Sequence, residues 1–378
     1  MKNPANHRFG KIVTGGAFLI PVIFALIILI PIGGCGRGNE NDEIITSTWR
    51  QDNTSGFGTA DNSRVPTMIM YNYELYVGTY NPVTGACIYK KDEDDWARVN
   101  TDDFNDPDNI GINCMVIYNN ELYAGTENGS GCQVWKLYGS DWSQVTTTSG
   151  FESSNNISAN NMAVWNGSIF VGTENSIDGC QVWKWDGSSW EKVNTDGFGD
   201  YQNISVDSLV VYTNQLYAGV RNTISGCRIY RYTGVGQVWN PVRSDAFGNT
   251  NNISVTAMGI HNVFLYCGIE NSITGSQVWM YNTGGTWARI NSNGFGYSTN
   301  TKIHSILSIS GTLYAITRNT SLGGQIWRYA PDYGEWNIAG DSGFGTTANY
   351  AFHSIINNNG TLTIGVDNDS GCRIYSMR

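Results

Sequence analysis

Positive charge is scarce in this sequence, and charge of either sign is sparse. Lysine and arginine together number 22 against 32 aspartates and glutamates, the formal net charge is −10, and only 14% of the residues are charged. Nucleic-acid binding needs a basic groove that neutralises phosphates, so the composition argues against a nucleic-acid partner. Anionic lipid headgroups are poor partners for the same reason. Asparagine, serine, threonine and glycine must therefore supply the solubility.

A repeat of 47 to 49 residues occupies most of the chain. One position, a glycine after a hydrophobic triplet in all copies but the sixth, recurs at intervals of 47, 47, 47, 49, 48 and 49 residues. These positions are Gly78, Gly125, Gly172, Gly219, Gly268, Ile316 and Gly365. A period of this length indicates a solenoid, a propeller or another repeat array.

Each copy contains four short strand patterns separated by turn signals. Examples, in their order within a copy, are residues 68–70, 75–79, 181–184 and 190–193. An Asn-Gly turn, an Asn-x-x-x-Gly hairpin and an Asp-Gly-Ser turn separate them. Four strands in about 47 residues match one blade of a propeller. No segment keeps a helical period over ten residues.

The two ends of the repeat region complement each other. The last copy ends at Arg378 without a fourth strand, whereas the segment around Trp49 matches the fourth strand around Trp190. Inserted as the missing strand, the N-terminal segment leaves the ring with no free sheet edge. The sequence therefore predicts an all-β fold over residues 45–378. We expect a seven-bladed β-propeller with four antiparallel strands per blade, the last blade closed by the N-terminal strand.

Seven copies of four strands with a composite last blade resemble the β-propellers of the WD40 and kelch families. The chain departs from both patterns, because it has neither the Gly-His and Trp-Asp pairs of WD40 repeats nor the double glycine of kelch repeats. The turn before Trp190 is similar to an Asp-box of sialidase-like propellers, and the other copies depart from it. The resemblance implies the architecture and transfers no active site.

Residues 1–34 have the pattern of a secretory signal peptide. Three basic residues precede an apolar stretch at 17–32, and small residues then lead to Cys35. This ending resembles the lipobox of bacterial lipoproteins, which implies that Cys35 is lipidated. Residues 35–44 would form a polar tether, with the propeller extracytoplasmic and lipid-anchored to a membrane of the cell envelope. An uncleaved transmembrane anchor is the alternative, because the apolar stretch is about as long as a short spanning helix.

Features that occur in every copy, or in most, are interpreted as structural. We expect the fourth-strand tryptophans and the loop phenylalanines to pack between blades. Turn asparagines such as Asn175 tolerate the turn conformation and bond their own backbone. Equivalent cysteines on a ring lie beyond disulfide reach, so we expect buried free thiols and no haem or zinc motif. These cysteines are Cys87, Cys132, Cys180, Cys227 and Cys372, with Cys114 and Cys267 in other strands.

Candidate binding residues differ between copies on one face, which we call the top face. It carries the loops between second and third strands and the loops between copies. Its predicted rim is Tyr80, Glu127, Glu174, Arg221, Glu270, Arg318 and Asp367. The predicted mouth of the central channel is Pro66, Asn113, Asn160, Asp207, Thr256, His304 and His353. The two histidines could approach each other, but with a distant Asp207 they do not complete a metal site, so none is expected. Inter-blade salt bridges and solvated histidines are the structural alternative.

The opposite face, which we call the bottom face, presents aromatic residues where the first strand of each copy ends. They are Tyr71, Tyr118, Trp165 and Tyr212. These rings could stack sugars or pack within their hairpins. The acidic loop 102–108 offers oxygen ligands but lacks the glycine-centred loop of an EF-hand. No cofactor is therefore expected beyond a weak calcium signal.

Three functional hypotheses follow. The favoured one is a membrane-anchored, extracytoplasmic binding or scaffold module that recognises an envelope protein or glycan through a propeller face. The alternative is a glycan-active hydrolase or lyase, which needs two carboxyl groups about 5 to 10 Å apart in a cleft. A sialidase-type site needs several converging arginines, and the rim offers Arg221 and Arg318. A structural subunit of an envelope assembly is a third possibility.

Overall fold

The structure is a computed structural model that describes residues 48–93 and 95–378. The predicted signal peptide, the tether and Cys35 lie outside the described residues. The described part contains β-strands and single turns of 3-10 helix. None of its helices has the length and apolar character needed to cross a membrane.

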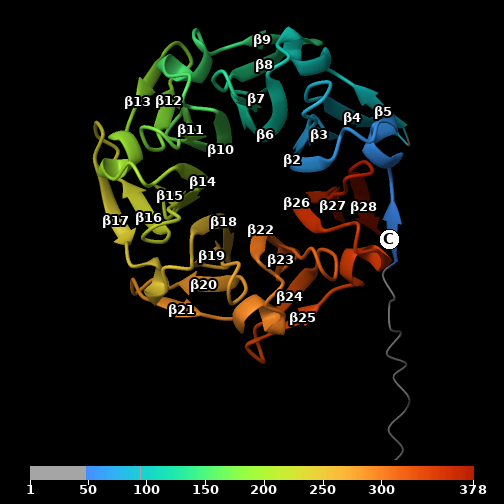
Figure 1. The fold of residues 1–378 in the computed structure, drawn as a ribbon, viewed down its shortest axis with the longest axis vertical. Helices are drawn as coiled ribbons and strands as arrows, with labels where there is room; N and C mark the ends of the chain where they lie inside the picture. The colour runs from blue at the N-terminus through green and yellow to red at the C-terminus, as the bar shows by residue number, and fades with distance from the viewer. Residues whose placement is uncertain (1–47, 94) are drawn as a thin grey trace, which may run out of the picture. The chain divides into compact units, whose positions relative to one another are not determined.

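The strands form four-stranded antiparallel blades around a central axis (Figure 1). The innermost strands are β2 (Arg64–Tyr71), β6 (Asn109–Tyr118), β10 (Ser158–Trp165), β14 (Ser205–Tyr212), β18 (Ser254–His261), β22 (Lys302–Ile309) and β26 (Ala351–Asn358). The second strands are β3 (Glu74–Tyr80), β7 (Glu121–Asn128), β11 (Ser168–Glu174), β15 (Gln215–Arg221), β19 (Phe264–Glu270), β23 (Thr312–Arg318) and β27 (Thr361–Asp367).

The outer half of each blade is shorter. The third strands are β4 (Ile88–Asp92), β8 (Val134–Tyr138), β12 (Val182–Trp185), β16 (Arg228–Tyr232), β20 (Gln277–Tyr281), β24 (Ile326–Ala330) and β28 (Arg373–Met377). The outermost are β5 (Asp95–Arg98), β9 (Asp141–Gln144), β13 (Trp190–Lys192), β17 (Trp239–Arg243), β21 (Trp287–Arg289), β25 (Glu335–Ile338) and β1 (Trp49–Gln51). The 3-10 turns are η1 (Ser55–Gly58), η2 (Asp102–Asn105), η3 (Ser149–Glu152), η4 (Asp196–Gly199), η5 (Ala246–Gly248), η6 (Asn293–Gly296) and η7 (Ser342–Gly345). The predicted all-β propeller is confirmed at this level.

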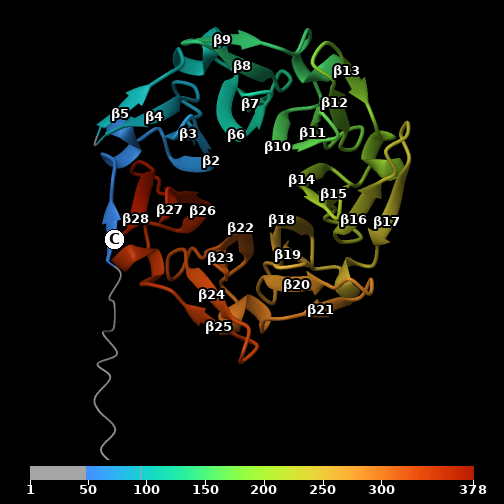
Figure 2. The ribbon, with the colours of Figure 1, turned by 180° about the vertical axis from the view of Figure 1, so that it is seen from behind.

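The first and last described strands lie side by side (Figures 1 and 2). β1 pairs antiparallel with β28, and Trp49 stands opposite Met377. Farther in, Ser354 Oγ of β26 donates a hydrogen bond of 2.8 Å to the Val65 carbonyl of β2. Segments from opposite ends of the described chain are thus joined by backbone and side-chain bonds.

The recurring glycine permits close approach between blades. A Cβ atom on Gly172 of β11 would lie 2.5 Å from Cγ1 of Val206 in the neighbouring β14. Gly219 of β15 meets Val255 of β18 in the same way, at 2.6 Å. No side chain fits at these distances, so a larger residue would push the next innermost strand away.

Aromatic rings pack between blades as predicted. Phe198 of η4 stacks on Tyr230 of the next blade, with ring centroids 4.4 Å apart, and meets Trp239 edge-on at 5.3 Å. Phe198 and its equivalents have φ between 50° and 58°, a region that bulky residues avoid, so the stacking must offset the backbone strain. The Trp239 indole donates to the Val193 carbonyl of the preceding blade at 2.8 Å.

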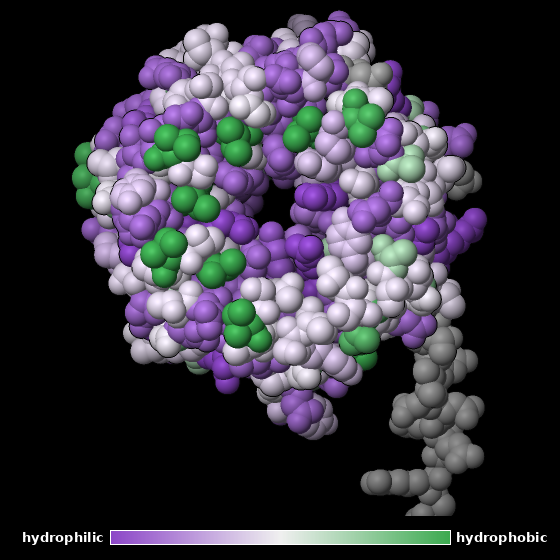
Figure 3. All heavy atoms as spheres, viewed as in Figure 1, coloured by the Kyte–Doolittle hydropathy of each residue, from purple (hydrophilic) through white to green (hydrophobic). Residues whose placement is uncertain are grey.

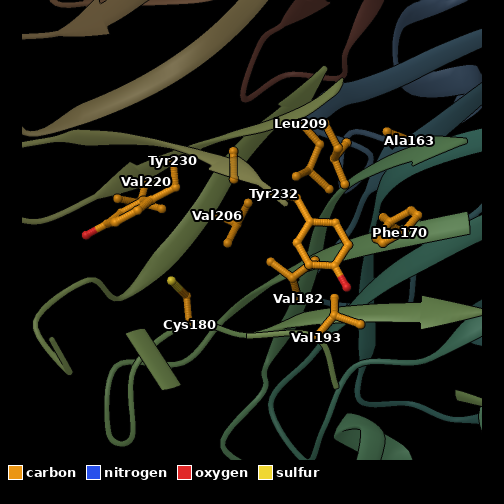
Figure 4. Close-up of a cluster of buried hydrophobic side chains, with 12 residues drawn as sticks. Ala163, Phe170, Cys180, Val182, Val193, Val206, Leu209, Val220, Tyr230 and Tyr232 are labelled. Atoms are coloured by element: carbon orange, nitrogen blue, oxygen red, sulfur yellow. The ribbon is translucent and has the colours of Figure 1, made fainter. Parts of the chain in front are cut away.

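The hydrophobic core is divided among the interfaces between blades. Figure 4 shows one such cluster, in which Phe170 and Val182 of one blade lie near Val206 and Tyr232 of the next. Burying an aliphatic side chain of this size contributes roughly 1.5–3 kcal/mol. The prediction of free thiols is confirmed for Cys114, Cys132, Cys180, Cys227, Cys267 and Cys372, which are all buried, and Cys87 is buried as well.

The turn asparagines bond their own backbone as predicted and also pair with a second, buried set. Asn175 Oδ1 accepts from the backbone nitrogens of Ile177 and Asp178 at 3.1 and 2.8 Å. Its Nδ2 donates to Asn156 Oδ1 at 3.1 Å. The equivalent pairs are Asn81–Asn62, Asn128–Asn109, Asn222–Asn203, Asn271–Asn252, Asn319–Asn300 and Asn368–Asn349. Because buried amides need partners, each pair fixes two top-face loops against each other.

Candidate functional site

A β-bulge in each innermost strand presents the residues of the channel mouth. In β14, Val206 pairs with Val220 and Ser208 with Gly219. Asp207, between them, therefore has no residue opposite it in the backbone register of β15. The same register shift occurs at Asn113, Asn160, Thr256, His304 and His353, and at 65–66 in β2. A bulge bends its strand and redirects the extra side chain. The predicted mouth residues are therefore all positioned by the same feature, a β-bulge in the innermost strand.

The structure brings most of the predicted top-face residues together around a cavity of about 330 Å³. Its wall comprises Arg64, Pro66, Tyr80, Asn113, Glu127, Asn160, Asn161, Glu174, Asp207, Arg221, Thr256, Lys302, His304 and His353. The sequence analysis missed Arg64, Asn161 and Lys302. The predicted Glu270, Arg318 and Asp367 are not part of this wall. Figure 3 shows that hydrophilic residues surround the central opening.

Asp207 and Arg221 form a partly buried ion pair in one wall of the mouth. Arg221 Nη2 lies 2.9 Å from Asp207 Oδ2 and 3.2 Å from Glu270 Oε2. Glu270 belongs to the next blade, so this is an inter-blade salt bridge of the kind expected under the structural alternative. Asp207 also accepts hydrogen bonds from the hydroxyls of Ser205 and Ser254. Burial alone would raise the pKa of Asp207, but Arg221 and these hydroxyls outweigh it and lower the pKa.

Glu127 and Glu174 line the same side of the mouth, but no arginine or lysine forms a salt bridge with either carboxylate among the described residues. Glu127 Oε2 accepts a hydrogen bond of 3.0 Å from Asn113 Nδ2. Burial and then the nearby Asp207 carboxylate raise the pKa of Glu174. The described ion pairs at the mouth involve Asp207, Glu270 and Asp367, and none involves Glu174. Glu174 is therefore a carboxyl group without a salt-bridge partner among the described residues.

His304 and His353 lie against each other on the other side. Their ring centroids are 4.1 Å apart, and the planes are tilted by 37°. His353 Nδ1 lies 2.9 Å from Asp367 Oδ2. His304 Nε2 is buried without a hydrogen-bond partner among the described residues. The expectation of solvated histidines is therefore wrong for the Nε2 atom of His304, which is buried beside the tilted ring of His353.

The carboxylate beside the two histidines is Asp367 and not Asp207, which is held by its arginine instead. Possible ligand atoms of His304, His353 and Asp367 lie within 4.8 Å of one another, and no other such group occurs in the described part of the chain. Burial, then His353 and the Lys302 ammonium, lower the pKa of His304 well below its usual range. The same positive charge opposes a divalent cation.

The bottom-face aromatics bridge neighbouring blades. Each donates its hydroxyl or indole N–H to a carbonyl in the first turn of the next blade: Tyr71 to Asn120 (3.0 Å), Tyr118 to Gly167 (2.9 Å), Trp165 to Asn214 (3.2 Å) and Tyr212 to Val263 (2.9 Å). These contacts give the recurring aromatics a structural role. Sugar stacking on this face stays a prediction.

The acidic loop at 102–108 uses its carboxylates to hold the next blade. Asp106 Oδ2 accepts hydrogen bonds from Asn128 Nδ2 at 3.1 Å and from Gln133 Nε2 at 2.5 Å. Asp108 Oδ2 accepts one from Ser130 Oγ at 2.5 Å. These donors occupy oxygen atoms that a calcium ion would need as ligands.

The sequence analysis missed a set of exposed aliphatic residues on the top face. Ile177, Ile224 and Ile273 hold the same position in three consecutive turns between second and third strands, and they are 66%, 67% and 67% exposed. Val83 and Leu322 are exposed in the equivalent turns of other blades. The signal was present, because an aliphatic residue follows the turn asparagine by two or three positions in these copies.

Comparisons with known proteins support the fold. No family model and no curated protein matches the sequence. The WD40 propeller domain of Doa1 is similar with a TM-score of 0.57 and 11% identity, over 87% of this chain and 97% of that chain. A chain of the Mitotic Checkpoint Complex is similar with a TM-score of 0.59 and 11% identity, over 94% of this chain and 99% of that chain. YCF48 from Cyanidioschyzon merolae has the same TM-score and identity, over 87% of this chain and 98% of that chain. At this identity the likeness shows the fold alone: the chain is a β-propeller repeat protein.

Proposed function

We propose that this protein is a binding module that recognises a partner protein through its top face. The observation that carries the proposal is the exposure of Ile177, Ile224 and Ile273 around a charged mouth. Single exposed aliphatic residues are ordinary, but a repeated set on one face with a polar surround is typical of protein interfaces. The similar chain from the Mitotic Checkpoint Complex also comes from an assembly.

Partner capture tests this proposal. The full-length chain is used to capture proteins from the cells that produce it, in parent form and as the triple variant Ile177→Ser, Ile224→Ser, Ile273→Ser. Tyr73 and Val263, which are 92% and 60% exposed in bottom-face turns, provide the matched control when both are changed to Ser. We expect the triple variant to lose at least tenfold in capture with an unchanged melting temperature. Loss in the control with retention in the triple variant would overturn the proposal.

The same proposal places the module outside the cytoplasm on a lipid anchor at Cys35. It rests on the basic, apolar and small-residue order of the first 35 residues. Cys35→Ser should block processing and abolish incorporation of labelled palmitate. Equal labelling of the variant would contradict lipidation at this residue.

The proposal also takes the blades as a closed seven-bladed ring, in which β1 serves as the outermost strand of the last blade. Support comes from the pairing of β1 with β28 and from the bond between Ser354 and Val65. The seven repeats of the sequence agree with this count. A closed ring presents its top-face loops as one rigid surface, which a binding module needs.

A glycan-active enzyme is the second candidate. The observation in its favour is that Glu174 has a raised pKa and Asp207 a lowered one at the same cavity, because a carboxyl pair with divergent pKa values suits general acid and stabilised anion roles. Hydrolysis of an envelope glycan by the parent protein, abolished in Glu174→Gln, would favour this candidate. An unchanged glycan would leave the binding module as the function.

A further inference from the structure

Charge is segregated around the channel mouth. Three consecutive blades contribute its acidic side: Glu127, Glu174 and Asp207. The basic side consists of Lys302, His304, His353 and Arg64. In Figure 1, β22 and β26, which carry Lys302 and the two histidines, lie across the central opening from the blades of the acidic side, whereas β2 with Arg64 lies beside β6. A hollow between such walls has a strong dipolar potential, which selects ligands by their charge distribution.

One charged group in each wall lacks an ion-pair partner. Asp207 is neutralised by Arg221, and Asp367 bonds His353. In contrast, neither Glu174 nor Lys302 has an ion-pair partner among the described residues.

The basic wall also contains a buried imidazole nitrogen. His304 Nε2 has no hydrogen-bond partner in the described part of the chain. Because leaving buried polar groups unpaired costs free energy, this atom marks the basic wall as a place for a ligand.

Two simpler occupants fit less well. A metal ion at His304 would sit beside the Lys302 ammonium, and Arg318 and Arg64 add further positive charge there. A simple anion would gain from this wall but would face Glu127 and Glu174 across the cavity. Each of these occupants meets one favourable wall and one repulsive wall.

We propose that the channel mouth binds a small zwitterion that carries a carboxylate and an ammonium group. The carboxylate accepts hydrogen bonds from the Lys302 and His304 side, and the ammonium group donates to Glu174 and Glu127. The cavity of about 330 Å³ is at the small end of ligand pockets, which span about 300–1,000 Å³. An amino acid or a dipeptide has the matching chemistry. The site lies on the face assigned to partner binding but needs no partner protein.

Calorimetric titration of the full-length protein tests the inference. The probes are glycine, 4-aminobutanoate and 6-aminohexanoate, a series of zwitterions with rising charge separation. Hexanoate and hexylamine carry one charge each and serve as matched probes. We expect at least one zwitterion to bind at least tenfold more tightly than either single-charge probe. Equal affinity for hexanoate would show an anion site and overturn the inference, as would absence of binding by all three zwitterions.

Two variants locate the site. Lys302→Met and Glu174→Gln should each weaken the zwitterion at least tenfold while the melting temperature stays near that of the parent. Lys184→Met, on the outer strand β12 where Lys184 pairs with Glu191, is the matched control and should leave affinity unchanged. Unchanged affinity in both site variants would overturn the inference, and Lys302→Gln repeats the test if Lys302→Met fails to fold. Partner capture does not enter this experiment, so its failure and that of the proposed function are separate results.

Discussion

His304 and His353 occupy the same bulge in neighbouring blades, with ring centroids 4.1 Å apart, yet only His353 has a carboxylate partner. Asp367 lies 2.9 Å from His353 Nδ1 and fixes that ring. His304 instead presents a buried nitrogen without a partner among the described residues. Two residues that are equivalent in the repeat therefore differ in their hydrogen bonding.

The first prediction concerns stability at acidic pH. Burial, His353 and then Lys302 lower the pKa of His304, so the unfolded chain binds this proton more readily than the folded one. Stability is therefore greatest above the unfolded pKa of about 6.5 and falls below it, by at most about 1.4 kcal/mol per pH unit. Urea denaturation from pH 7 to 5 should show a flatter dependence in His304→Gln. Burial also lowers the pKa of His261, so this residue contributes to the loss of stability at acidic pH in the same direction. It is present in both the parent and His304→Gln, so it does not affect the comparison. Identical profiles would contradict the prediction.

The second prediction concerns the buried asparagine pair. Asn156 bonds Asn175, the Gly150 carbonyl and Gln181, and each buried group left without a partner costs about 1–3 kcal/mol. Asn156→Ala should therefore lower the free energy of unfolding by more than about 3 kcal/mol. Its neighbour Asn155 bonds the exposed Asp178 carboxylate, and Asn155→Ala should cost about 1 kcal/mol or less. If urea denaturation shows that Asn156→Ala loses no more than the roughly 1 kcal/mol expected of Asn155→Ala, the buried pair does not stabilise the fold.

The repeat made the fold predictable because packing requires one glycine in six of the seven copies. Gly172 has room for no side chain against Val206, and the equivalent glycines of five other copies make the same kind of close contact, while the sixth copy has Ile316 there. The aromatic contacts of Phe198 were predictable for the same reason. Features repeated in every copy are constraints on neighbouring blades, and a sequence period records such constraints directly.

The site was predicted less completely, because its contacts join residues that do not repeat. The histidines were matched with Asp207, while the structure matches His353 with Asp367. One regularity could have corrected this, since mouth and rim residues of one copy are 14 positions apart and bond in the pairs Asn113–Glu127, Asp207–Arg221 and His353–Asp367. The aliphatic position of Ile177 does recur with the repeat, but its exposure was visible only in the structure.

The third prediction separates the two interpretations of the bottom face. The Tyr212 hydroxyl donates to the Val263 carbonyl at 2.9 Å, and loss of a hydrogen bond costs about 1 kcal/mol. Tyr212→Phe should therefore lower the free energy of unfolding by about this amount in urea denaturation, while it keeps the ring that a sugar would stack on. A glycan array probed with Tyr212→Phe and with Trp165→Ala completes the test. Glycan binding that survives in Tyr212→Phe and is lost in Trp165→Ala would favour sugar stacking.

The last prediction concerns closure of the ring. The Trp49 ring lies 5.0 Å from Phe344, as the Trp190 ring lies 4.8 Å from Phe151 in another blade. If β1 is the outermost strand of the last blade, the two tryptophans do the same structural work, and each change to Ala should cost roughly 3–5 kcal/mol. The Trp49 loss should be the smaller, because Trp190 Nε1 donates to a carbonyl and Trp49 Nε1 has no described partner. Thermal melting measures both, and Arg50→Ala on the exposed side of β1 is the control, with an effect within about 0.5 kcal/mol. If the melting temperature of Trp49→Ala equals that of Arg50→Ala and lies far above that of Trp190→Ala, the N-terminal strand does not close the ring.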